Sequence, residues 1–261
     1  MTLFSPSTQS RIDALMAVGP VKVWSVVVTV MGDLCRRPGD RLSGRTLDMI
    51  LAPMGINNQA LRTALHRLKR DGWIEAARDG RGSSYALTPL GRDRTEAVRP
   101  IIYAAGPSAV MPVHLILPDP SLPAPDLADF LPEDSLVLPH RAALFAGPEQ
   151  DLPEGALIAS VPSGPLPDWL RDSVADPELC AEYEALCTAT LFDLPRDPIA
   201  RLVVRLAAFH HYRRLRLRHG DLPDLLLGPT WPGARARSRI ADLRAECPRP
   251  AISTLQAVAE A

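Results

Sequence analysis

The sequence of 261 residues predicts an α+β fold with helices at both ends and short strands between them. Three observations carry this prediction. Apolar residues recur at helical spacing in residues 57–70 and again from residue 198 onward. Two short extended segments flank a glycine-rich turn after residue 72. The 27 prolines cluster between Pro107 and Pro198, which predicts a middle region of short elements and many turns.

The first predicted helix covers residues 21–36. Its apolar run, residues 23–31, is rich in β-branched side chains, so propensity alone also allows a buried strand. We favour a helix because its length and the helical stretch at residues 47–51 fit the three-helix core that a wing requires, with Gly55 in the turn before the third helix. The run is too short to span a bilayer, and we expect neither a membrane anchor nor a secretory signal.

The third helix is expected to begin at Asn57 or Asn58 and to end near Arg70, because asparagine caps a first turn and Gly72 stops the helix. Its apolar stripe consists of Leu61, Ala64, Leu65 and Leu68. The opposite face carries side chains suited to base edges and phosphates in a major groove: Asn58, Gln59, Arg62, Thr63, His66, Arg67 and Lys69. An ordinary solvent-exposed face is the alternative.

The segment after this helix predicts a two-stranded wing. Residues 73–77 are apolar and extended, residues 79–82 supply the turn, and residues 84–88 form the return strand. Arg78 and Arg81 near the tip have no apolar role, and we expect them at the phosphate backbone or minor groove. Thr88 and Pro89 then open another helix. Together these features predict a winged helix-turn-helix and make double-stranded DNA the first partner to consider.

The formal net charge of −1 conceals a strong segregation of charge. Residues 1–106 contain 15 Lys and Arg against 9 Asp and Glu, residues 107–195 contain 2 against 15, and residues 196–261 contain 12 against 6. These blocks predict a winged helix-turn-helix domain at 1–106, an acidic, proline-rich middle domain at 107–195 and a helical C-terminal domain at 196–261. A local basic field steers a protein to DNA, so near-neutrality of the whole chain does not exclude that partner.

Catalytic signals are weak. The four cysteines lack metal-ligand spacing and indicate free thiols in a reducing compartment. Adjacent histidines at 210 and 211 point in different directions on a helix, and no carboxylate or cysteine stands at ligating distance along the sequence. The chain also lacks a phosphate-binding glycine loop and a serine elbow. We therefore expect no metal, no cofactor and no enzymatic activity.

Two motif sets resemble the PaaX-like repressors, the phenylacetic acid degradation operon regulators. The C-terminal set follows a helix capped by Asp197 and comprises His211-Tyr212-Arg213-Arg214, Asp221-Leu222-Pro223, Leu226-Leu227 and Trp231-Pro232-Gly233. The N-terminal set comprises Ala60-Leu61-Arg62-Thr63-Ala64-Leu65, Arg67-Leu68, Gly72-Trp73 and Tyr85-x-Leu87-Thr88-Pro89-x-Gly91-Arg92.

The resemblance implies a cytoplasmic bacterial transcriptional repressor that binds a palindromic operator as a homodimer and leaves it when an aryl-acetyl coenzyme A thioester binds. It also implies a small ferredoxin-like α/β middle domain, here reduced, with strands within residues 109–117, 135–138, 142–145 and 156–161. Tryptophans typical of the family's first middle strand are absent.

The resemblance also implies an effector site. The residues we assign to it are His211, Tyr212, Arg213, Arg214 and Trp231. Arginine suits the phosphates of an acyl coenzyme A because the planar guanidinium forms paired hydrogen bonds. In the alternative, these arginines pair with acidic residues of the middle block, and Trp231 is a packing anchor. Two functional alternatives also stay open. One is a winged-helix regulator of another pathway with another ligand or a protein partner, without coenzyme A binding, and the other is a protein-interaction module whose helix face is covered in the monomer.

Overall fold

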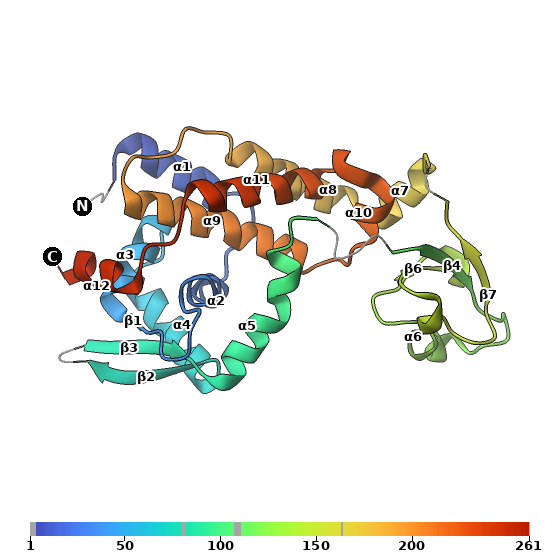
Figure 1. The fold of residues 1–261 in the computed structure, drawn as a ribbon, viewed down its shortest axis with the longest axis horizontal. Helices are drawn as coiled ribbons and strands as arrows, with labels where there is room; N and C mark the ends of the chain where they lie inside the picture. The colour runs from blue at the N-terminus through green and yellow to red at the C-terminus, as the bar shows by residue number, and fades with distance from the viewer. Residues whose placement is uncertain (1–3, 80–81, 107–110, 163, 261) are drawn as a thin grey trace.

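The computed structural model describes residues 4–79, 82–106, 111–162 and 164–260 of the chain. A helical unit with a β-hairpin occupies one end of the elongated molecule, and a small sheet occupies the other (Figure 1). The elements of the first unit are α2 (Val23–Leu34), β1 (Leu42–Ser43), α3 (Gly44–Leu51), α4 (Asn58–Arg70), β2 (Ile74–Asp79), β3 (Gly82–Leu87) and α5 (Pro89–Ile102). The antiparallel strand order β1-β3-β2 completes the predicted winged helix-turn-helix.

Local signals set the boundaries of these elements. The Asn57 side chain accepts a hydrogen bond from the backbone N–H of Ala60 at 2.8 Å and caps α4, and Thr88 caps α5 through Gly91 at 3.0 Å. Gly55 has φ +77°, a conformation that favours glycine and turns the chain between α3 and α4. The predicted caps and turn are therefore confirmed.

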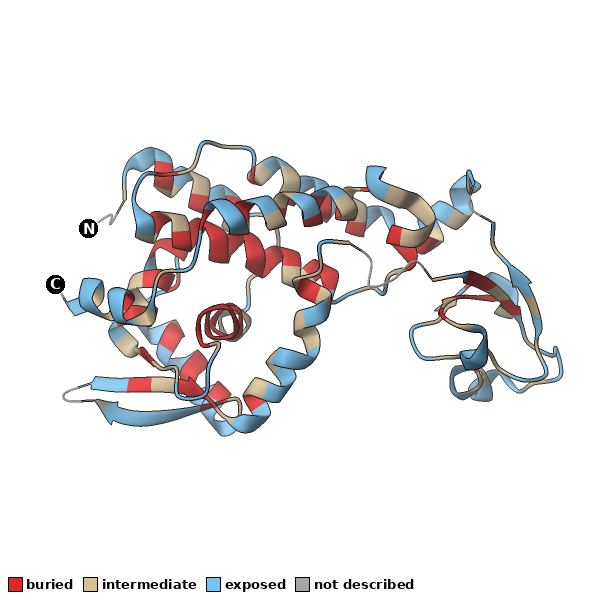
Figure 2. Ribbon diagram, in the orientation of Figure 1, coloured by how far each residue is buried: buried red, intermediate tan, exposed pale blue. Residues whose placement is uncertain are grey.

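The β-branched segment is a helix, α2, rather than a buried strand. Residues on all sides of it are buried, among them Val26, Val27, Val28 and Val30, because α4, α5 and α9 (Pro198–Arg216) lie around it (Figure 2). Burial of its whole circumference outweighs the modest helix penalty of β-branched side chains.

The middle region contains a second sheet with the strand order β5-β6-β4-β7, and every neighbouring pair is antiparallel. Its elements are β4 (Val113–Leu117), α6 (Leu127–Phe130), β5 (Leu136–Val137), β6 (Ala143–Ala146) and β7 (Leu157–Ser160). This order and these directions are those of the ferredoxin-like β-α-β-β-α-β motif. Its helices are reduced: α6 has four residues, and a 3₁₀ turn at Glu149–Asp151 stands between β6 and β7. Residues 109 and 110 of the first predicted strand lie outside the described residues.

A layer of helices connects the two ends of the molecule, the winged helix-turn-helix and the small sheet. Besides α9 it contains α1 (Pro6–Met16), α7 (Asp168–Val174), α8 (Pro177–Ala189), α10 (Leu222–Leu227), α11 (Pro232–Glu246) and α12 (Ile252–Glu260). One hydrophobic cluster extends from α1, α2 and α4 through α8 and α9 to α11 and α12, and α9 runs through its centre (Figure 2). Helix α8 belongs by sequence to the acidic block at 107–195, but it packs against α9 and α11 of the helical layer. Within the described residues, no helix is long and apolar enough to cross a membrane.

Candidate nucleic-acid interface

Helix α4 presents one uninterrupted polar face to solvent. The predicted apolar stripe of Leu61, Ala64, Leu65 and Leu68 is buried against the core. Every predicted DNA-contacting residue of the helix is exposed: Asn58, Gln59, Arg62, Thr63, His66, Arg67 and Lys69. Since no described part of the monomer covers this face, the condition that would favour a protein-interaction module is not met.

Several of these side chains are already held in place. Asn58 Nδ2 donates to Asp48 Oδ1 at 3.1 Å, which ties the start of α4 to α3. The Arg67 guanidinium pairs with Asp71 at 3.4 Å and lies 5.1 Å from the centroid of the Trp24 ring. In contrast, Arg62 takes part in no ion pair or side-chain hydrogen bond with the described residues, and the same is true of His66 and Lys69. These three are available to an external partner.

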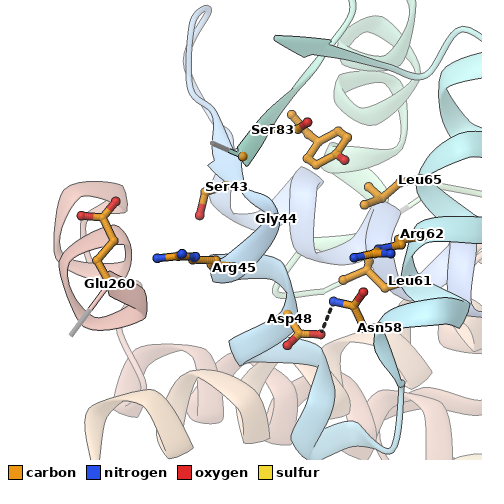
Figure 3. A pocket seen from close by; sticks show the side chains of 12 residues that line it. Ser43, Gly44, Arg45, Asp48, Asn58, Leu61, Arg62, Leu65, Ser83 and Glu260 are labelled. Carbon is orange, nitrogen blue, oxygen red and sulfur yellow. Dashed lines mark hydrogen bonds between the residues drawn. The ribbon is translucent and has the colours of Figure 1, made fainter. Parts of the chain in front are cut away.

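A groove of about 640 Å³ lies between the start of α3, the first half of α4 and the wing (Figure 3). Arg45 of α3 and Arg62 of α4 come from neighbouring helices that line it, with Ser83 and Tyr85 on the wing side. Glu260 at the end of α12 lies beyond Arg45. The groove thus brings a second exposed arginine close to the α4 face.

Arg45 is not among the DNA-contacting residues predicted from the sequence, although Ser43 is a helix-capping residue that marks the start of a helix there. The Ser43 side chain accepts a hydrogen bond from the backbone N–H of Thr46 at 3.1 Å, so Arg45 lies in the first turn of α3. The capped first turn of the first helix in a helix-turn-helix is a place where side chains meet phosphates. On the wing, Arg78 is exposed on β2, and Arg81 lies outside the described residues.

The five residues assigned to an effector do not converge on one open site. His211 and Tyr212 are buried in the core, with 0% and 1% of their surface exposed. Burial lowers the pKa of His211 to about 4, so its ring is neutral near pH 7. Trp231 is also buried and donates its indole N–H to Asp224 Oδ1 at 2.9 Å. That contact fits the packing-anchor alternative.

The two arginines of the set face other elements. Arg213 donates to Ser25 and Thr29 on α2, and Arg214 forms an ion pair with Glu182 on α8. Glu182 pairs with Arg218 as well, and the hydrogen bonds from both arginines contribute to lowering its pKa. Glu182 belongs to the acidic block, so these pairs fit the alternative in which the arginines hold parts of the chain together.

The uncovered polar face of α4, the groove beside it and the wing define a winged-helix protein with a basic recognition surface. Comparison with protein families gives a match of residues 22–91 to the PaaX-like protein model and of residues 175–257 to the PaaX-like protein C-terminal domain model. The chain therefore belongs to the PaaX-like family, and the C-terminal match includes α8.

Two known proteins illustrate the similarity. The chain is 27% identical over 248 residues to the transcriptional repressor PaaX of Escherichia coli (strain K12), a match that covers 84% of this chain and 78% of that protein. In structure it is similar to the uncharacterized protein Rv0674 from Mycobacterium tuberculosis, with a TM-score of 0.52 and 18% identity over 89% of this chain and 97% of that one. The second similarity shows the fold alone.

Proposed function

We propose that this protein is a DNA-binding transcriptional repressor without catalytic activity. The observation that carries the proposal is the exposed polar face of α4, flanked by Arg45 of α3 and by the wing. The similarity to a protein named as a transcriptional repressor supports the same role. A protein with this role acts in the cytoplasm, where bacterial DNA is found.

In the proposed complex, α4 lies in the major groove. Gln59 and Arg62 have the donors and acceptors that read base edges, whereas Lys69 and Arg45 suit phosphates. Arg78 on the wing would reach the backbone or the minor groove. A homodimer would place two α4 helices about one DNA turn apart, roughly 34 Å, or a multiple of it, and the operator would then be palindromic.

The test starts with DNA sites that the purified protein selects from random-sequence duplexes. Replacing Arg62 by Ala should weaken binding to the selected site by about 1–3 kcal/mol if Arg62 reads a base, and preference at one base position should relax. Lys69→Ala should weaken binding to all sequences alike. It should also reduce the slope of log affinity against log salt concentration by about 1, the loss of one phosphate contact. Fluorescence anisotropy at fixed salt measures both effects.

Arg235→Ala is the matched control. Arg235 is exposed on α11, where it pairs with Glu184 far along the chain from α4, so its loss should leave DNA affinity unchanged. Undiminished binding by the Arg62 variant would remove Arg62 from the interface. Failure of the unmodified protein to select any DNA sequence would refute the proposed function itself.

The regulated pathway and the signal are finer proposals. We infer that the operon serves catabolism of an aromatic acid of the phenylacetate type, and that an aryl-acyl coenzyme A thioester releases the protein from its operator. Family membership supports this inference. Calorimetric titration with phenylacetyl coenzyme A, run beside an operator-release assay, tests it. Absence of both heat and release would favour the alternative, a regulator of another pathway with another ligand or a protein partner.

A further inference from the structure

A cavity of about 360 Å³ lies where α2, α5 and the last turns of α9 meet, apart from the groove beside α4. Its walls are largely apolar and aromatic, with Trp24 and Val28 from α2, Trp73 from the start of the wing, Val98 from α5 and Phe209 from α9. Cavities of this size and character hold small organic ligands. The flat rings among its walls suit an aromatic one.

Arg213 is a partly buried charge in this cavity that lacks a counter-ion. The Arg213 guanidinium donates to Thr29 Oγ1 at 3.1 Å and to Ser25 Oγ at 2.9 Å, and both acceptors are neutral hydroxyls. A third, longer bond of 3.3 Å goes to the backbone carbonyl of Ser25. Within the part of the chain that the structure describes, no carboxylate forms an ion pair with Arg213. Partial burial of an unpaired guanidinium is unfavourable, and an anion beside it would remove that penalty.

The other charged groups around the cavity are Asp33, Arg214 and Arg94. Asp33, its one carboxylate, accepts hydrogen bonds from Arg205 at 2.9 and 3.0 Å and from the Tyr103 hydroxyl at 2.6 Å. Arg214 is paired with Glu182. Arg94 lies over the Trp73 ring at 5.2 Å and forms no ion pair with the described residues, but unlike Arg213 it is exposed to solvent. Because Asp33 is neutralised by Arg205, the cavity has a positive character that selects against cations.

We propose that this cavity binds a small aromatic carboxylate, with its ring against Trp24, Trp73 and Phe209 and its carboxylate paired with Arg213. The structure also connects the cavity to α4. Arg67 of α4 stacks on Trp24, and the Trp73 backbone N–H donates to the Leu68 carbonyl at 2.9 Å. An occupant therefore touches two residues that hold the end of α4. Binding in the cavity goes beyond the proposed function, whereas its effect on α4 rests on that function.

The test uses 2-naphthoate as probe and 2-naphthamide as its neutral counterpart, with binding followed by calorimetry and by quenching of tryptophan fluorescence. We expect saturable binding of 2-naphthoate to the full chain and weaker binding of the amide. Arg213→Gln should weaken 2-naphthoate binding about tenfold or more and leave amide binding unchanged, because only the carboxylate uses the charge. Val98→Trp should abolish binding of both probes by filling the cavity.

The control is Arg235→Gln, a change of the same charge at a distant exposed site, which should bind 2-naphthoate like the unmodified protein. Equal 2-naphthoate affinity before and after Arg213→Gln would overturn the proposal, and so would undiminished binding by Val98→Trp or no binding by the unmodified protein. DNA affinity without probe, measured on the same samples, separates the two proposals. If the unmodified protein binds DNA but not 2-naphthoate, only the cavity proposal is refuted, and if it binds 2-naphthoate but no DNA, only the DNA-binding role is refuted.

Discussion

Replacing Arg205 by Met should destabilise the protein strongly, because Arg205 forms a buried ion pair between α9 and α2. Its side chain is 4% exposed and that of its partner Asp33 is 0% exposed. Two parallel hydrogen bonds of 2.9 and 3.0 Å join the guanidinium to the carboxylate. The remaining guanidinium nitrogen donates to the carbonyls of Arg244 and Cys247 at 2.9 and 3.0 Å. The one side chain thus joins three helical segments.

The magnitude follows from what the substitution leaves behind. The Asp33 carboxylate would stay buried with the Tyr103 hydroxyl as its remaining side-chain donor among the described residues. Loss of one partner of a buried pair costs about 3–5 kcal/mol. Adding Asp33→Leu to Arg205→Met removes both charges, and it should recover most of that loss because an apolar pair of similar volume is often neutral or better.

The assay is urea unfolding followed by circular dichroism and by tryptophan fluorescence. Arg235→Met is the control, because the pair of Arg235 with Glu184 is half-exposed and such pairs contribute about 0–1 kcal/mol. The reasoning is refuted if Arg205→Met lowers the free energy of unfolding no more than this control does. Coincident transitions with the two probes would indicate one cooperative unit. Separate transitions would instead support independent domains, as the charge blocks at 1–106, 107–195 and 196–261 suggest.

Two further predictions concern stability. Burial lowers the pKa of His210 to about 3 and that of His211 to about 4, so below pH 6.5 the unfolded chain binds protons that the folded chain does not, and stability falls by about 1.4 kcal/mol per pH unit for each histidine. His211→Leu should therefore reduce the loss measured by urea unfolding between pH 7.5 and pH 5 by about 2 kcal/mol, and an unchanged loss would contradict the assignment. Gly91→Ala should cost about 1–3 kcal/mol in thermal unfolding, since the added Cβ would lie 2.0 Å from the carbonyl oxygen of Trp73. Gly164→Ala, which meets no atom within 4 Å, is its control, and equal effects would contradict the steric reason.

The winged helix-turn-helix was predictable from the sequence because its signals are local. A cap at Asn57, a glycine turn at Gly55 and a stripe of leucines each act within a few residues, and all are found as expected. The ferredoxin-like middle domain came from the family resemblance, and a sheet with that strand order is found. Charge separation along the chain indicated where the basic surface lies.

Features that depend on distant segments were not predictable in this way. Helices α1 and α8 escaped notice, and both pack against α9 across long stretches of sequence. The sequence motif around His211 led us to expect an effector site open to solvent, because a helix normally keeps one face in solvent. Helix α9 is instead covered on nearly all sides, so His211 and Tyr212 are interior residues. Only the fold shows that Arg213 belongs to a cavity with two tryptophans.

The position of α9 has a mechanical consequence for the proposed repressor. Arg205 and Arg213 attach it to α2 at two points two turns apart, and Arg214 attaches the same helix to Glu182 of α8. Helix α2 in turn packs against α4 and carries Trp24, on which Arg67 rests. A ligand that alters the Arg213 contacts therefore acts on α2 directly and on the DNA-facing helix through one further contact. A signal reaching α4 by this route requires no movement of the ferredoxin-like sheet.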